Sequence, residues 1–406
     1  METLSNWYNK ICDTPKTIEC PEMHIHGGRT GKKPVFTGPG QINIKSSTHI
    51  DFMMHAIPTD TAEALTLMEK SRKNPYETLD QFLLNATDYG GTEWNCGWIQ
   101  PRLKGLPKTG WPLTGRIEGL LTMASGDMVS KHSSIELIFS PSFQIPTEKQ
   151  MITVSSIEGK EINKEWSAGK QTVRVLDTEV NFFYSTSGNA LWLTAETSEE
   201  LQHPYAENWV SEPLRILLGQ LIYPRLIARN LGDGSAQIWL RASPPKLKHS
   251  EIVSMTGGNA ASMGSMFWDL YSALLRFIAK ACDEDEHPNF EPNQVTRFYH
   301  ELIQATQGSR WVLCMTLSSV AEGLLRLIIP PIRGQRYKAD NNMKGLVEQK
   351  ILKNEDRKAW TKVRHAVMHG YLVSPWADRE EDDQIRHLID LVHRLTHKLI
   401  DNPTEA

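Results

Sequence analysis

The chain is predicted to be an α+β protein of several domains, with a β-rich, sandwich-like or barrel-like N-terminal domain and an all-helical bundle after it. Three observations predict this. First, 406 residues exceed one ordinary hydrophobic core, so two or three domains are expected. Second, short runs rich in Ile, Val, Thr, Phe and Trp fill the first part of the chain. Third, helical spacing of apolar residues takes over near residue 250.

Composition bounds the class of protein. With 40% apolar and 23% charged residues, the chain is typical of a soluble globular protein rather than a disordered one. Its first residues, METLSNWYNK, lack the basic and then apolar pattern of a signal peptide, and no uncharged apolar window of roughly 18 residues occurs. Five scattered cysteines fit reduced thiols better than a disulfide framework. We therefore expect a cytoplasmic protein that does not engage a membrane.

The expected strands are short and bounded by Gly, Pro, Ser or Asn, which favours an antiparallel sandwich or barrel. They are Pro34–Lys45, His49–Ile57, Arg116–Met123, Ser134–Phe139, Met151–Ile157, Gln171–Val175, Val180–Tyr184, Ala190–Ala195 and Ala236–Arg241. Ser187, Gly188 and Asn189 indicate a hairpin turn, because glycine tolerates a positive φ. One helix is expected to interrupt the strands, opening at Pro213 and running toward Asn230, with a single apolar stripe.

The expected helices follow a Pro244-Pro245-Lys246 linker. They are Met263–Ala281, Gln294–Thr306, Arg310–Ile328, Met343–Leu352, Glu355–Tyr371 and Asp383–Ile400, with Asn354 as a candidate N-cap of the fifth. These patterns divide the chain into a β-rich domain at 1–245, a linking helical segment at 246–292 and a helical domain at 293–406.

One segment of the helical domain carries a catalytic pattern. Between Trp360 and Tyr371 the sequence places Arg364, His365, His369 and Gly370 in the order Arg-His-x-x-x-His-Gly. This resembles the active-site motif of the HEPN superfamily, and the segment Leu317–Leu325 is also HEPN-like; the resemblance covers roughly residues 293–406. It implies a metal-independent ribonuclease with a composite site in a homodimer. Arg364 and His369 would be its catalytic pair, and His365 would occupy the polar position of the motif.

The residue chemistry supports the same roles. Histidine titrates near neutrality and can move the proton of a 2′-hydroxyl, whereas arginine stays charged and binds phosphate oxygens in a bidentate fork. This scheme needs no metal and no cofactor. Five helical residues turn through about 500°, so Arg364 and His369 lie about 140° apart around the helix axis. Two copies facing each other across a two-fold axis would bring both residue types to one cleft, with Val367, Met368 and Tyr371 holding the contact.

A basic stretch precedes the motif. Residues 333–364 contain ten Lys or Arg and four Asp or Glu, a local balance of +6 in a chain of net charge −4. Such a stretch is the electrostatic footprint of a phosphate-binding surface, although a lysine-rich helix is more often only a solvated face. The candidate RNA-binding residues are Lys344, Lys350, Lys353, Lys358 and Lys362.

The N-terminal part carries a second resemblance. The segments 38–44 (GPGQINI), 213–220 (PLRILLGQ) and 223–230 (YPRLIARN) are similar to the β-rich region of ApeA-type HEPN proteins of bacterial abortive infection. This resemblance implies that the N-terminal domain senses a phage-derived trigger, and that the helical domain then cuts cellular RNA, with tRNA as one candidate target.

Several alternatives stay open. The helical domain could be an inactive HEPN module that binds nucleotide or RNA, or that drives oligomerisation. Arg364 would then bridge to Asp356 or Glu322, and His369 would be a satisfied buried histidine. A metalloprotease is disfavoured because the His365/His369 pair lacks the Glu of H-E-x-x-H. Zinc binding by the loose cluster Cys12, Cys20, His24 and His26 is a further open question. The three later histidines, His387, His393 and His397, are interpreted as part of a solvated helix face.

Overall fold

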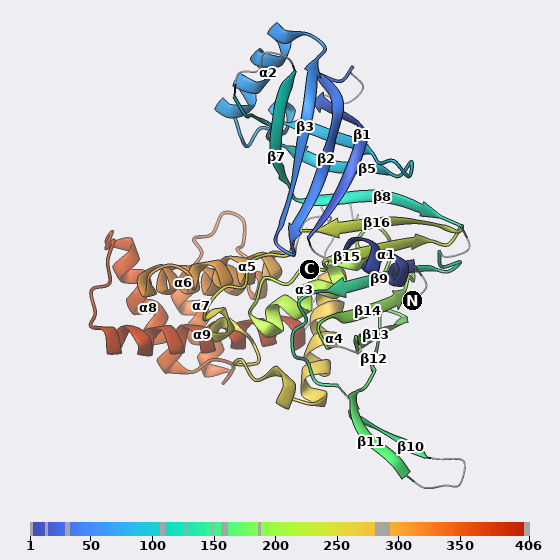
Figure 1. The fold of residues 1–406 in the computed structure, drawn as a ribbon. Helices are drawn as coiled ribbons and strands as arrows, with labels where there is room; N and C mark the ends of the chain where they lie inside the picture. The colour runs from blue at the N-terminus through green and yellow to red at the C-terminus, as the bar shows by residue number, and fades with distance from the viewer. Residues whose placement is uncertain are drawn as a thin grey trace.

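The computed structural model describes residues 3–12, 15–28, 33–105, 110–126, 129–147, 149–155, 161–185, 188–280 and 293–401. The chain is α+β, as the sequence predicts: a 14-stranded sheet comes first and a block of helices follows it (Figure 1). All strand pairs in the sheet are antiparallel.

The strands of this sheet follow the order β12-β13-β14-β9-β15-β16-β8-β5-β4-β1-β2-β3-β7-β6. Their bounds are β1 Lys16–Gly27, β2 Phe36–Ser46, β3 His49–Pro58, β4 Phe82–Thr87, β5 Glu93–Ile99, β6 Arg102–Leu103, β7 Trp111–Ile117, β8 Gly119–Ser125, β9 Ser133–Phe139, β12 Gln171–Val175, β13 Thr178–Tyr184, β14 Leu191–Glu196, β15 Leu226–Leu231 and β16 Ser235–Arg241. A separate hairpin, β10 Lys149–Ser155 and β11 Glu161–Ala168, projects away from the sheet (Figure 1).

Alternation of side chains explains the local choice of strand. In β16 every second residue is buried, and β4 shows the same period of two. The expected run Arg116–Met123 is in fact two strands, because β7 ends at Ile117 and β8 begins at Gly119. Gly188 has φ +70° in the expected turn between β13 and β14, whereas Ser187 lies outside the described residues.

The expected helix from Pro213 to Asn230 is wrong at both ends. Helix α3 spans Ala206–Leu218, so Pro213 lies inside it rather than in its first turn. Gly219 ends the helix with φ +59°, and a Cβ there would lie 2.8 Å from the backbone oxygen of Ser250. Leu226–Leu231 forms strand β15 between β9 and β16. Strand β15 begins with Leu226, Ile227 and Ala228, which are all buried, and periodicity alone does not separate so short an apolar run from a helix.

Helices make up the rest of the fold. They are α1 Thr3–Ile11 and α2 Thr61–Lys73 beside the sheet, and then α4 Ser265–Ala279, α5 Gln294–Ala305, α6 Arg310–Ile328, α7 Ala339–Glu348, α8 Asn354–Met368 and α9 Asp378–Asp401. Short 3-10 turns occupy Thr78–Asp80, Ser250–Val253 and Ala260–Ser262. The last six helices coincide with the six expected after the linker, apart from their ends. Lys353, rather than Asn354, is the N-cap of α8.

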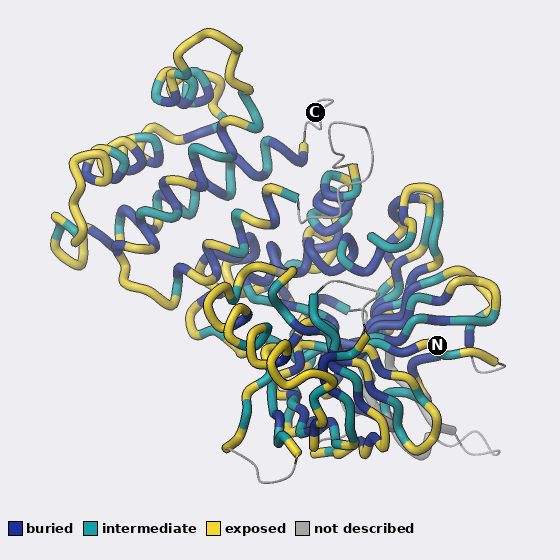
Figure 2. Tube along the Cα trace, turned by 90° about the horizontal axis from the view of Figure 1, so that it is seen from above, coloured by how far each residue is buried: buried dark blue, intermediate teal, exposed yellow. Residues whose placement is uncertain are grey.

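The hydrophobic core crosses from the sheet into the helices. One cluster of buried residues lies in the sheet with α1 and α2, between Leu4 and Leu240. The other runs from Ile135 in β9 to Ile400 in α9 and includes β12, β13 and β14 together with α3 to α9. Buried residues therefore line the strands and the inner sides of the helices, and exposed ones collect at turns (Figure 2). The expected divisions at residues 245 and 292 remain predictions, and this second cluster extends across both of them.

Among the described residues, only α6 is long and apolar enough to cross a membrane, by length and composition alone. Half of that apolar stretch is buried inside the fold, where α6 packs against α5, α8 and α9. A core helix of a soluble protein has the same features, so α6 is compatible with a soluble protein.

Two glycines in the helical block give a matched prediction. Gly345→Ala in α7 should raise the free energy of unfolding by about 0.5–1 kcal/mol, because nothing lies within 4 Å of the added Cβ. Gly323→Ala in α6 should lower it by about 1–3 kcal/mol, because the added Cβ would lie 2.6 Å from the Phe298 ring of α5. Denaturant unfolding followed by circular dichroism measures both changes. Equal effects of the two substitutions would contradict the close packing of α5 on α6.

Candidate active site

Helix α8 carries the three motif residues Arg364, His365 and His369. Its buried face consists of Asp356, Ala359, Trp360, Val363 and Ala366, which recur at helical spacing and pack against α6, α7 and α9. Trp360 fixes this face, since its Nε1 donates to the backbone oxygen of Ser318 in α6 at 3.1 Å. His365 and His369 lie on the exposed side of the same helix.

Gly370 sets the position of His369. The N–H of Gly370 donates to the oxygen of Val367 at 3.0 Å, and the N–H of Tyr371 donates to the oxygen of Ala366 at 3.3 Å. These two bonds form a Schellman cap, which needs a residue in the left-handed region, and Gly370 has φ +74°. A Cβ there would meet nothing within 4 Å, so backbone conformation rather than space favours glycine. The cap leaves His369 exposed at the end of α8.

Arg364 is engaged but accessible. Its Nε donates to Glu322 Oε2 of α6 at 3.1 Å, and its guanidinium lies 5.3 Å from the Trp360 ring centroid. Its side chain is 41% exposed. Glu322 also accepts a bond from Arg326 at 3.0 Å. Burial raises the pKa of Glu322, but hydrogen bonds from Arg326 and Arg364 outweigh it and leave that pKa below its usual value.

The two histidines form a pair. The rings of His365 and His369 lie edge to face, with their centroids 4.2 Å apart. This is the contact expected of residues four apart on one helix face. Among the described residues, no side chain hydrogen-bonds to either ring, so both imidazoles are available to a ligand.

The structure separates Arg364 from His369. Arg364 turns toward Glu322 on α6, whereas His369 stands on the exposed end of α8, in keeping with their angular separation of about 140°. The non-catalytic alternative expects an ion pair of Arg364 and a buried His369. The structure contains the Arg364–Glu322 ion pair, but His369 is exposed. Asp356 binds other partners: its carboxylate lies 2.9 Å from His387 Nδ1 and 3.4 Å from Arg394 Nε of α9.

An exposed apolar rim adjoins His369. It comprises Val367, Met368, Tyr371, Leu372 and Val373, which are 39%, 70%, 50%, 91% and 73% exposed. Trp311 anchors the rim, because its Nε1 donates to the backbone oxygen of Tyr371 at 3.0 Å. Contiguous exposed apolar side chains of this kind mark contact surfaces in soluble proteins.

The five candidate lysines divide into two groups. Lys358 and Lys362 share the exposed face of α8 with His365 and His369, at spacings of four, seven and eleven residues from Lys358. Lys362 is also 3.5 Å from Glu380. The others, Lys344, Lys350 and Lys353, lie in α7, in the turn after it and at the N-cap of α8. Lys353 is therefore about 24 Å from His369 along the helix axis, at 1.5 Å per residue.

The interpretation of His387, His393 and His397 as a solvated face is wrong for His393. His393 Nε2 lies 3.2 Å from the backbone oxygen of Val253, and its ring stacks on Tyr299. Burial lowers the pKa of His393. His387 binds the fully buried Asp356, as described above. The apolar spacing of Leu388, Leu391, Val392 and Leu395 marks the buried face of α9, and it could have placed His393 beside that face.

No group of three or more His, Cys, Asp or Glu that could hold a metal is present among the described residues. Of the loose N-terminal cluster, Cys20 is buried, and burial raises its pKa to about 11. His24 is bound instead to Glu22 at 2.8 Å.

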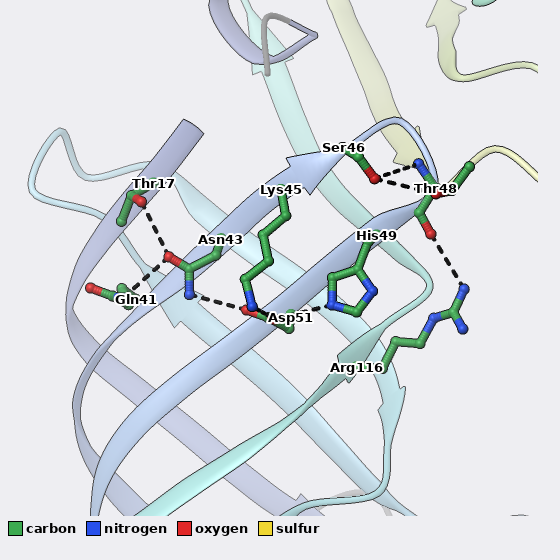
Figure 3. Close-up of polar contacts among 9 residues, drawn as sticks. All are labelled: Thr17, Gln41, Asn43, Lys45, Ser46, Thr48, His49, Asp51 and Arg116. Atoms are coloured by element: carbon green, nitrogen blue, oxygen red, sulfur yellow. Dashed lines mark hydrogen bonds and ion pairs between the residues drawn. The ribbon is translucent and has the colours of Figure 1, made fainter. Parts of the chain in front are cut away.

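A polar network also covers β2 and β3 (Figure 3). Asp51 is at its centre: Asn43 donates to it at 3.1 Å, His49 lies 3.2 Å away, and Lys45 forms an ion pair with it. Burial raises the pKa of Asp51, but the bonds from Lys45, Asn43 and His49 outweigh it and lower that pKa overall. Because the Asp51 carboxylate is paired with Lys45 within the network, we interpret the network as stabilising β2 and β3 rather than as a reactive site.

Comparisons of the chain with protein-family models, with curated proteins and with solved structures find no match.

Proposed function

We propose that this chain is a HEPN-type, metal-independent endoribonuclease that cuts cellular RNA, with tRNA as a candidate, in anti-phage abortive infection. The observation that carries the proposal is the exposed His369 at the glycine-capped end of α8, paired with His365 on the helix that also bears Arg364. The resemblance of this motif to HEPN ribonucleases supplies the reaction class. By the ApeA-like resemblance, the sheet region senses a phage-derived trigger.

The proposed reaction is transesterification. His369 takes the proton of the ribose 2′-hydroxyl, and the 2′ oxygen attacks the adjacent phosphorus. The 5′ oxygen leaves and takes up a proton, so the products are a 2′,3′-cyclic phosphate and a 5′-hydroxyl. Arg364 binds the non-bridging oxygens, on which negative charge develops. His365 positions the His369 ring through their edge-to-face contact.

Arg364 has to leave Glu322 in order to reach a phosphate. Glu322 keeps its bond from Arg326 when that happens, so its carboxylate is not left without a cation. The exchange therefore avoids an unpaired, partly buried charge, which is the costly outcome of breaking an ion pair. RNA phosphate can compete with Glu322 for a side chain that is already 41% exposed.

The alternative function is an inactive HEPN module that binds RNA or nucleotide or acts as an oligomerisation platform. The Arg364–Glu322 bond favours this alternative, because it occupies the cation that the reaction needs. Growth and tRNA integrity after induction separate the two, with wild type compared with His369→Ala. Toxicity and RNA cleavage that depend on His369 support the nuclease, and identical behaviour of the two chains supports the binding module.

We predict that cleavage is independent of divalent metal. The described residues offer no cluster of acidic or histidine ligands at the site. RNA cleavage should therefore persist in excess EDTA and leave a 2′,3′-cyclic phosphate or its hydrolysed product, detected by end-group analysis. Loss of cleavage on chelation, restored by added Mg²⁺, would overturn this prediction.

We predict that the lysines and His369 affect different steps. Replacing Lys358 and Lys362 by Gln should weaken RNA binding and lower the salt slope by about one unit per lysine, with turnover at saturating RNA preserved. The matched pair Lys344→Gln and Lys350→Gln, farther from His369, should have a smaller effect. His369→Ala should keep affinity and reduce kcat by at least about 100-fold.

Filter binding across a salt series and single-turnover cleavage measure these quantities. An unchanged RNA affinity and salt slope in the Lys358/Lys362 variant would show that this face of α8 is only a solvated surface.

We predict that the active form is a homodimer or a higher oligomer in which the apolar rim forms the contact. Sedimentation at the assay concentration should give at least a dimer, and Met368→Asp should shift it toward monomer with loss of cleavage. If Arg364 of one copy serves His369 of the other, mixed dimers of Arg364→Ala and His369→Ala chains regain one intact site.

Each variant alone should be inactive, and the heterodimer should recover about half of wild-type activity. A fully active monomer would end the case for a shared site. An inactive heterodimer would show that each chain uses its own pair.

A further inference from the structure

A small polar pocket lies between α3 and α5, where the sheet meets the helical block. Its volume is about 280 Å³. Helix α3 contributes Asn208, Glu212 and Arg215 to it, at spacings that place them on one helix face. From α5 come Arg297, His300 and Glu301, again on one face. Tyr223, in the segment after α3, completes the lining.

Arg215 is the unusual member of this pocket. It is only 5% exposed, and its Nε is buried without a hydrogen-bond partner. No hydrogen bond or ion pair joins its guanidinium to any other described residue, and its one ring contact is with Tyr223, at 4.6 Å. By contrast, the buried Arg225 donates to the backbone oxygen of Ser47 at 2.9 Å. A buried N–H group without an acceptor is costly, and an anion bound at Nε would remove that cost.

The nearest buried carboxyl group does not replace such an anion. Glu212 Oε2 accepts a hydrogen bond from Thr296 at 2.8 Å, and no ion pair with Arg215 is formed. Burial raises the pKa of Glu212, against opposing contributions from Thr296 and Arg215. Among the described residues, no carboxylate therefore forms a hydrogen bond with the buried Nε of Arg215.

A second donor faces the same space. The Gln304 side chain lies 2.6 Å from His300 Nε2. That Nδ1 lies 3.5 Å from the Tyr223 hydroxyl oxygen. Burial, and then Arg215, lower the pKa of His300, which keeps the ring neutral. The hydroxyl group of Tyr223 has one hydrogen, which it can donate to a ligand in the pocket.

We propose that this pocket binds a small oxyanion, a phosphate or carboxylate group, which Arg215 holds in a bidentate fork and Tyr223 contacts as a second donor. The volume is below the range of drug-sized ligand sites, about 300–1,000 Å³, so the ligand is a small anion rather than a polynucleotide. This site does not depend on the ribonuclease proposal.

Isothermal titration of the full chain with inorganic phosphate, and separately with succinate, tests the site and tells the two anion classes apart. We expect saturable binding of at least one of them with a Kd on the order of 1 mM or tighter. Arg215→Met should weaken that binding by at least about tenfold, because it removes a charge-assisted bond and keeps the buried apolar stem. Tyr223→Phe should weaken it less.

Arg174→Gln is the control, since this side chain is 85% exposed and lies far along the sheet on β12; its affinity should equal that of wild type. Thermal unfolding of each variant verifies the fold, and the anion should raise the Tm of wild type but not of Arg215→Met. Absence of saturable binding by both anions, or unchanged affinity in Arg215→Met, would overturn the site. If Arg215→Met does not fold, unchanged affinity in Tyr223→Phe has the same force.

Discussion

The burial of α3 is the constraint on which the rest of the structure depends. Twelve of its thirteen residues are buried, in contact with β9, α4 and α5. Its polar side chains bond to both the sheet and the helical block. Arg229 of β15 forms an ion pair with Glu207, and Thr296 of α5 donates a hydrogen bond to Glu212. Tyr271 of α4 donates to the backbone oxygen of Val210 at 2.9 Å. A helix from the middle of the strand-rich sequence therefore holds the sheet and the helical block together.

Regular patterns of hydrophobicity were enough to predict most of the helical block. The expected bounds of α6 match the structure, and α5 and α9 differ only at their ends, because each has a clear apolar face and a stop such as Pro330-Pro331. The sheet was predicted less completely. Strands including β1, β4, β5 and β15 were missed, since the unpatterned run of β15 resembles a buried helix and β1 contains Pro21 at an irregularity of its pairing with β2. The single 14-stranded order depends on pairing between distant segments, which no local pattern encodes.

Part of the candidate site could also be predicted from the spacing of residues in the sequence. Period and spacing placed His365 and His369 on one face of a helix, and that face is exposed. The sequence offered Asp356 and Glu322 as examples of an acid that could bind Arg364, and Glu322, four residues before Arg326 on α6, is the one that does. The length of α8 separates Lys353 from His369, and the local charge count along the sequence does not contain that separation. Arg215 left no trace in the sequence, because the absence of an acceptor is a property of the packed structure.

The continuous core across β9, β12 to β14 and the helices bears on how any signal would travel. A fragment that stops after β16 would expose the apolar underside of its strands, and a fragment that starts at α5 would expose the side of α5 that packs against α3. Neither piece has a complete interior of its own. A displacement of the sheet would therefore be transmitted to the helices through packed side chains. No flexible linker is needed to couple the two parts.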